Sequence, residues 1–203
     1  MAHLGFDERP PGVLAGADSG EGVRWLVDLE IAPWTSPSRI CFTVAWGVTV
    51  PGIEAVLDDP EPVRNDVRGC PIHGMLGQVD QKLDPTWFEL KPRPWPLPSL
   101  LDPSLAQRVL GAVHRDVLPR LQLYTSAADV QAHLYDRLEH SRGVPTADEL
   151  STIRRIAAVS LLLGERENAL RWIEHLAARL EAAMAPDLAA ERVAPLRRLC
   201  LAS

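Results

Sequence analysis

Hydrophobic and polar residues alternate in two stretches of the amino-terminal half. Residues 23–31 carry apolar side chains at every second position, and residues 40–50 place large apolar side chains in the same way. An apolar period of two is typical of a strand with one face against a core. The pattern therefore predicts strands over residues 23–31 and 40–50. Weaker patterns predict two shorter strands, over residues 70–79 and 86–90.

The second face of the predicted strand 40–50 is made of small side chains. These are Cys41, Thr43, Ala45, Gly47 and Thr49. Small side chains let another backbone, a helix or a ligand approach a sheet closely. We expect a helix to pack on this Cys41–Thr49 face. A small-ligand site on the same face, with Trp46 or Trp87 beside the ligand, is an alternative.

The carboxy-terminal half has a helical period instead. Apolar residues recur at spacings of three and four in four segments, which end at cap residues, glycine or proline. This spacing predicts amphipathic helices over residues 103–119, 126–142, 146–163 and 167–184. The last two form a hairpin with the form of a single tetratricopeptide-type unit. We also expect a helical turn at residues 53–57 and a tail helix that reaches about residue 201.

Together these elements predict an α+β fold, in which an amino-terminal antiparallel sheet of about four strands packs with carboxy-terminal helices. Residues 1–22, rich in Gly, Pro and Asp, are expected to form a mobile arm. Residues 23–145 would form the α+β domain, and residues 146–203 a helical hairpin and tail packed on it. Four prolines in residues 91–98 predict an extended connector, because proline has no N–H for a sheet ladder.

Charge is unevenly distributed along the chain. The 203 residues include 27 acidic and 21 basic ones, a net charge of −6, and residues 1–100 alone hold 14 acidic and 8 basic ones. Since non-specific nucleic-acid binding needs a basic patch, the sequence makes a nucleic-acid partner unlikely. No apolar run approaches the ~20 residues that span a bilayer, and the acidic start is unlike a signal peptide. We expect a cytoplasmic protein without a membrane partner.

Cys70 and His73 form the one Cys/His cluster in the sequence. A nucleophilic cysteine needs a nearby base, but residues three apart on a strand point to opposite faces. A turn at Pro71 or Gly74 would bring the two side chains together. A zinc site would need a second pair of ligands. The sequence contains no glycine-rich phosphate loop, and we expect no cofactor and no metal.

Two tryptophans lie in proline-flanked segments where full burial is difficult, Trp34 and Trp95. Exposed aromatic side chains are favoured at protein interfaces. The acidic loop that contains Asp58 and Asp59 would suit a basic partner. These four residues are the candidate binding residues, although docking of the two loops onto the sheet is the simpler explanation of the tryptophans.

The strand–loop–strand block resembles a bacterial domain-of-unknown-function family, the one numbered 4304. The segments that carry the resemblance are Phe42-Thr43-Val44, Gly47-Val48, Pro51-Gly52, Gly69-Cys70-Pro71-Ile72, Leu76-Gly77 and Trp87-Phe88-Glu89-Leu90. The similarity covers roughly residues 23–140. The sequence differs from the family pattern at Met75, where an arginine is expected, and in lacking a helix before Gly5-Phe6. The resemblance implies the fold and no particular activity.

These observations favour a non-enzymatic protein that binds another protein, of the immunity type that neutralises its partner. An acidic sheet half, the absence of a catalytic motif and a helical hairpin all point in this direction. A thiol-dependent enzyme that uses Cys70 and His73 is the first alternative, and a small-ligand binder on the Cys41–Thr49 face is the second. The oligomeric state is left open.

Overall fold

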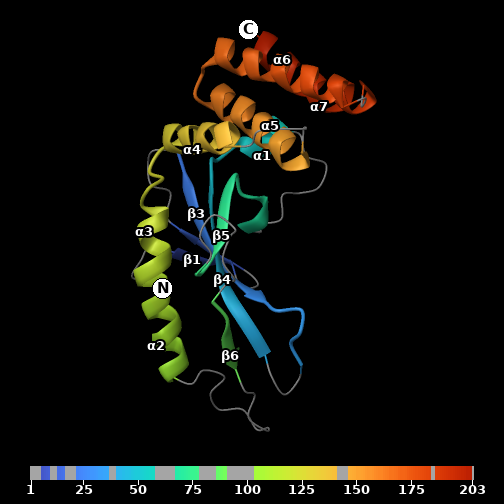
Figure 1. Cartoon of the computed structure of the whole chain (residues 1–203). Helices are drawn as coiled ribbons and strands as arrows, with labels where there is room; N and C mark the ends of the chain where they lie inside the picture. The colour runs from blue at the N-terminus through green and yellow to red at the C-terminus, as the bar shows by residue number, and fades with distance from the viewer. Residues whose placement is uncertain are drawn as a thin grey trace. The chain divides into compact units, whose positions relative to one another are not determined.

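The computed structural model describes residues 6–9, 13–16, 22–36, 40–57, 67–77, 86–90, 103–140, 146–183 and 186–202. The chain divides into two compact units, each assembled from separate segments. Unit 1 comprises residues 1–18, 24–48 and 65–124, and unit 2 comprises residues 19–23, 49–64 and 125–203. The predicted α+β fold is confirmed, with an antiparallel sheet in the amino-terminal half and helices in the carboxy-terminal half (Figure 1).

In the described part of the chain, the sheet contains six strands. They are β1 (Phe6–Arg9), β2 (Val13–Gly16), β3 (Arg24–Ile31), β4 (Ile40–Thr49), β5 (Ile72–Met75) and β6 (Phe88–Leu90). The spatial order is β1-β2-β3-β4-β5, and β6 also pairs with β4. The two longest strands are those with the strongest alternation in the sequence. The structure differs from the predicted arm at residues 1–22, since β1 and β2 form a hairpin that extends the sheet.

β5 and β6 follow the same edge of β4, one after the other. Trp46 lies opposite Gly74 on β5, and Phe42 lies opposite Phe88 on β6. Between them, the backbone N–H of Leu76 donates to Val44 O, and the N–H of Thr86 donates to Leu76 O. The predicted third and fourth strands therefore do not pair with each other as a simple meander would. They are two pieces of one edge, separated by residues 78–85.

A nearly continuous helix forms the last part of unit 1 in the sequence. It consists of α2 (Pro103–Ala112), the π-helical turn η3 (Val113–Val117) and α3 (Leu118–Leu121). The predicted end at Pro119 is wrong, because the helix continues to Leu121. Proline cannot donate its N–H and crowds the carbonyl four residues earlier. The wider π-turn, in which the N–H of Leu118 donates to Val113 O, directly precedes Pro119.

Unit 2 is helical. It contains α1 (Ile53–Leu57), α4 (Ala127–His140), α5 (Ala147–Leu162), α6 (Arg166–Ala182) and α7 (Pro186–Leu201). Successive helices from α4 to α7 pack on each other, and α1 packs against α5 and α7. The hairpin of α5 and α6 is centred on Gly164, which has a φ of 76° that favours glycine. The core that α5, α6 and α7 share includes Ile153, Ile173, Leu176 and Leu196, all fully or almost fully buried.

The cap residues in the sequence predicted most of the helix starts and ends. Thr146 caps α5, because its side chain accepts a hydrogen bond from the N–H of Glu149. Ser126 accepts one from the N–H of Asp129 at the start of α4. The division into parts differs from the predicted boundary at residue 145, since α4 belongs with the helical unit 2.

Candidate interaction surface

β3 carries apolar side chains that reach solvent at its carboxy-terminal end. The alternation in residues 23–31 indicated one buried face, and Val23 and Val27 are indeed buried. Leu29 and Ile31 continue the same alternation but are 50% and 62% exposed. The predicted buried face is thus wrong at these two positions. Large contiguous apolar patches are favoured at interaction sites, whereas scattered exposed apolar residues are ordinary.

Trp34 lies in the turn that follows β3 and is 58% exposed. Its ring packs edge-on against Trp87, with ring centroids 4.8 Å apart. The turn is held in place by two contacts, since Thr35 N–H donates to Ala32 O and Thr35 Oγ1 bonds the backbone of Cys41. Trp34 is therefore a large aromatic side chain that packs against Trp87 and is open to solvent. The sequence indicated only that full burial of this side chain would be difficult.

Acidic residues alternate with these apolar residues along β3. Because successive side chains of a strand point to opposite faces, Asp28 and Glu30 lie on the other face of the sheet from Leu29 and Ile31. Exposed aromatic and aliphatic side chains are favoured at protein-binding surfaces. We call Leu29, Ile31, Trp34 and Trp87 the β3-end surface.

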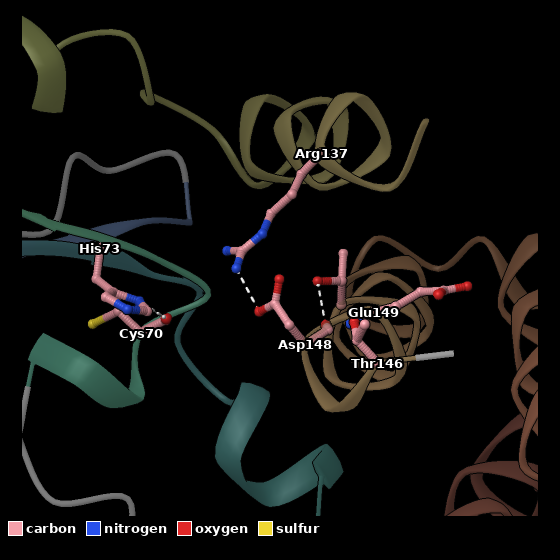
Figure 2. A network of polar contacts seen from close by, with 7 residues as sticks. Cys70, His73, Arg137, Thr146, Asp148 and Glu149 are labelled. Atoms are coloured by element: carbon pink, nitrogen blue, oxygen red, sulfur yellow. Dashed lines mark hydrogen bonds and ion pairs between the residues drawn. The ribbon is translucent and has the colours of Figure 1, made fainter. Parts of the chain in front are cut away.

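Cys70 and His73 do not form a nucleophile–base pair. Cys70 is only 3% exposed, and it lies in a buried cluster with Leu26, Ala45 and Val67. The His73 ring bonds the backbone carbonyl of Cys70, not its thiol, with Nδ1 at 3.1 Å from the oxygen (Figure 2). A histidine that donates to a carbonyl cannot take a proton from the thiol through that nitrogen. The arrangement supports a structural role for both residues.

The small-residue face of β4 is filled at Gly47 by the chain itself. A Cβ atom at this position would lie 2.8 Å from Cys70 Sγ and 3.2 Å from Val67 O. The 3-10 turn η2 (Val67–Gly69) and Cys70 thus occupy the space that the missing side chain leaves. The close approach predicted from the sequence is made by a 3-10 turn and a cysteine in place of the expected helix. No space is left for a ligand at Gly47.

Unit 2 contains a polar network between three helices. Gln131 on α4 donates to Ser160 Oγ on α5 and to Glu165 Oε2, both at 2.9 Å. Asn168 on α6 donates to Tyr135 Oη at 2.7 Å and to Glu165 Oε2 at 3.0 Å. The hydrogen bonds from Gln131 and Asn168 lower the pKa of Glu165. This network ties the helices together, and its members offer no nucleophile with an adjacent base.

Two further polar contacts in unit 2 hold α4 and α6 to α5. Arg137 of α4 pairs with Asp148 at the start of α5 at 2.5 Å, next to the Thr146 cap (Figure 2). Arg179 of α6 pairs with the buried Glu149 at 2.6 Å. Glu149 is buried, and the ion pair with Arg179 leaves its carboxylate with a partner of opposite charge.

Other predicted site residues lie outside the described part of the chain. These are Trp95, Asp58 and Asp59. Within the described residues, no group of three or more His, Cys, Asp or Glu side chains is placed to hold a metal ion. Among the helices described, none combines the length and apolar character needed to cross a membrane.

Comparisons with known proteins give no relative. No family model, no curated protein and no solved structure matches the chain. The geometry of the residues described above is therefore what bears on function.

Sequence reasoning missed two parts of the β3-end surface. It placed Leu29 and Ile31 in the core because they continue the apolar alternation of β3. Alternation alone does not show whether another element covers these side chains. It named Trp87 only in connection with a ligand site. The Pro-Trp-Thr sequence at Trp34 was the one signal that pointed to this surface.

Proposed function

We propose that the protein is a non-enzymatic protein-binding module, of the immunity type that neutralises a partner, and that it binds this partner through the β3-end surface. The observation that carries the proposal is Trp34, which is 58% exposed and packs edge-on against Trp87. Tryptophan is enriched among the residues that dominate binding energy, because it buries a large rigid surface.

Charge supports a basic partner. The chain has a net charge of −6, and Asp28, Glu30 and Glu89 lie within two residues of members of the β3-end surface in the sequence. Complementary charge speeds association and excludes unsuitable partners, while the apolar centre supplies affinity. The same charge makes nucleic acid an unsuitable partner, because its phosphates are negative.

The thiol-dependent alternative gains no support from the site geometry. Cys70 is buried, and the His73 ring is engaged by a carbonyl. Catalysis by a cysteine needs an accessible sulfur whose proton a base can remove.

The test uses a photo-activatable cross-linker in the full chain. Placed at Trp34, it should capture one protein from the source lysate that a cross-linker at Leu123 does not capture. Leu123 is 68% exposed in the same unit and is the matched control. The captured protein is then purified, and its affinity is measured for the unmodified chain and for the variants Trp34→Ala and Leu123→Ala.

Loss of an interface tryptophan costs on the order of 2 kcal/mol or more, which is about thirtyfold in Kd. We expect Trp34→Ala to weaken binding by about this factor and Leu123→Ala to leave it unchanged. Equal affinity of the two variants, or capture that does not depend on position 34, would contradict the proposal.

A further inference from the structure

Unit 2 carries an aromatic pair that joins α4 and α6. Tyr135 of α4 and Trp172 of α6 have ring centroids 5.4 Å apart, with their planes inclined at 36°. The indole N–H of Trp172 donates to Tyr135 Oη at 3.2 Å. Trp172 also packs against the buried core that α5, α6 and α7 share, and both rings are partly exposed. The two rings are therefore held relative to each other and still expose aromatic surface to solvent.

The carboxylate of Glu165 lies beside this pair. Asn168 connects the two, since its Nδ2 donates to Tyr135 Oη at 2.7 Å and to Glu165 Oε2 at 3.0 Å. Gln131, which is only 8% exposed, donates to the same carboxylate oxygen at 2.9 Å. These hydrogen bonds lower the pKa of Glu165, so its carboxyl group is ionised at neutral pH. An anionic group is thus held next to two aromatic rings.

The charge of Glu165 is not balanced within this network. Gln131 and Asn168 donate to it through neutral amides, and both donate to Oε2. Among the described residues, no basic side chain pairs with Glu165. Since the amide nitrogens are used inside the network, their carbonyl oxygens remain as further acceptors. The carboxylate and the two amides therefore leave acceptor oxygens, one of them charged, for a ligand.

We propose that Tyr135, Glu165, Asn168 and Trp172 form a binding site for a guanidinium group. The guanidinium stacks on the exposed aromatic surface, as cations do on tryptophan and tyrosine, and donates to Glu165 Oε1 and to an amide oxygen. The four residues belong to unit 2, whereas the β3-end surface belongs to unit 1. The site is therefore additional to the proposed function and does not depend on it.

The chemistry of the site favours guanidinium over other cations. A guanidinium is planar and weakly hydrated, so it stacks on aromatic rings while its N–H groups donate to oxygens in its plane. A lysine ammonium is compact and strongly hydrated, and a quaternary ammonium has no N–H for the acceptor oxygens. Anions are disfavoured by the charge of Glu165. Free arginine and an arginine within a protein chain both carry the group that fits.

The experiment titrates the full ¹⁵N-labelled chain with three probes at low ionic strength, since salt screens exposed charges. The first probe is a capped glycine–arginine–glycine peptide. The second contains citrulline in place of arginine, which keeps the shape and removes the charge, and the third is free arginine. The resonances followed are the indole N–H of Trp172, assigned with the variant Trp172→Phe, and the side-chain amide of Asn168. We expect the arginine peptide to shift both resonances to saturation and the citrulline peptide to shift neither.

Variants near the start of α6 test the role of the carboxylate. Glu165→Gln removes the charge and keeps an oxygen that accepts from Gln131 and Asn168, so the ties between the helices remain. It should weaken binding of the arginine peptide about fivefold, the loss expected for one ion pair at a protein surface. Glu167→Gln is the matched control, because Glu167 is exposed on the same helix and its substitution removes the same charge. It should leave binding unchanged.

The outcomes separate this site from the proposed function. Equal shifts with the arginine and citrulline peptides, or equal losses in Glu165→Gln and Glu167→Gln, would overturn the guanidinium site. A saturable shift with arginine alone supports it, and the tighter of the peptide and free arginine identifies the source of the group. Capture of a partner through Trp34 is measured independently, so either proposal can fail while the other stands.

Discussion

Two residues, Gly47 and Glu165, show how the immediate neighbours of a side chain determine its size and its ionisation. Gly47 is small because Cys70 fills the space above it, and Glu165 is ionised more readily because two amide groups donate to it. The sequence identified the small-residue face and the cysteine separately. It could not show that the two touch, because this contact joins positions 23 residues apart through a turn. Both residues yield quantitative predictions.

Gly47→Ala should destabilise unit 1. The added methyl group would lie 2.8 Å from Cys70 Sγ and 2.9 Å from its Cβ. Overpacking of this kind costs about 1–3 kcal/mol, measured as the free energy of unfolding in denaturant. The double variant Gly47→Ala, Cys70→Gly should recover part of the loss. Gly111→Ala is the control. An added Cβ there has no neighbour within 4 Å, so on helix α2 it should gain about 0.5–1 kcal/mol. A neutral Gly47→Ala would show that Cys70 does not fill this space.

The pKa of Glu165 should lie below its usual 4.5 because Gln131 and Asn168 donate to its carboxylate. A folded-state pKa below the unfolded one means that this carboxylate stabilises unit 2 fully above pH 4.5 and loses that contribution as the pH falls through the lowered value. In an NMR titration of the side-chain carboxyl group, Gln131→Ala should raise the pKa of Glu165 toward 4.5. A pKa of 4.5 or above in the unmodified chain would contradict the network.

Helices and strands differ in how well the sequence predicts them. Helix bounds follow from local chemistry, and the capped starts of α4 and α5 and the stop at Gly164 agree with it. The bounds of the strands depend on partners that lie far away in sequence. The β1–β2 hairpin and the collinear β5 and β6 were therefore not predicted, although β3 and β4 were. Pro119 is an intermediate case, because the π-turn before it accommodates a residue that usually ends a helix.

Thr146→Ala should weaken α5 by about 1 kcal/mol, the usual cost of removing a side-chain helix cap. Thr146 Oγ1 accepts the hydrogen bond from the N–H of Glu149 at 3.1 Å, and alanine has no acceptor to replace it. Urea denaturation gives the change in stability. Thr146→Ser keeps the hydroxyl group and should stay within a few tenths of a kcal/mol of the unmodified chain. Equal losses in the two variants would show that the cap contributes nothing.

At the scale of the whole molecule, the chain consists of a sheet-containing unit and a helical unit. Unit 1 holds 11 acidic and 10 basic residues and unit 2 holds 16 and 11, so the acidic excess lies mainly in the helical unit. The sequence predicted a sheet followed by helices and one residue of the candidate surface, Trp34, but the acidic excess of residues 1–100 does not coincide with the sheet-containing unit. The sequence did not predict that Leu29 and Ile31 reach solvent, because alternation does not show whether another element packs on that part of the sheet face. The polar network of unit 2 ties its helices together, and the described surface that supports the proposed function lies on unit 1.

The measurement that tests the central claim most directly is the affinity of the captured partner for three forms of the chain. These are the unmodified protein, Trp34→Ala and Leu123→Ala. If the partner binds through the β3-end surface, Trp34→Ala should raise Kd about thirtyfold and Leu123→Ala should leave Kd unchanged. A Kd for Trp34→Ala that matches those of the other two forms would show that the partner binds elsewhere.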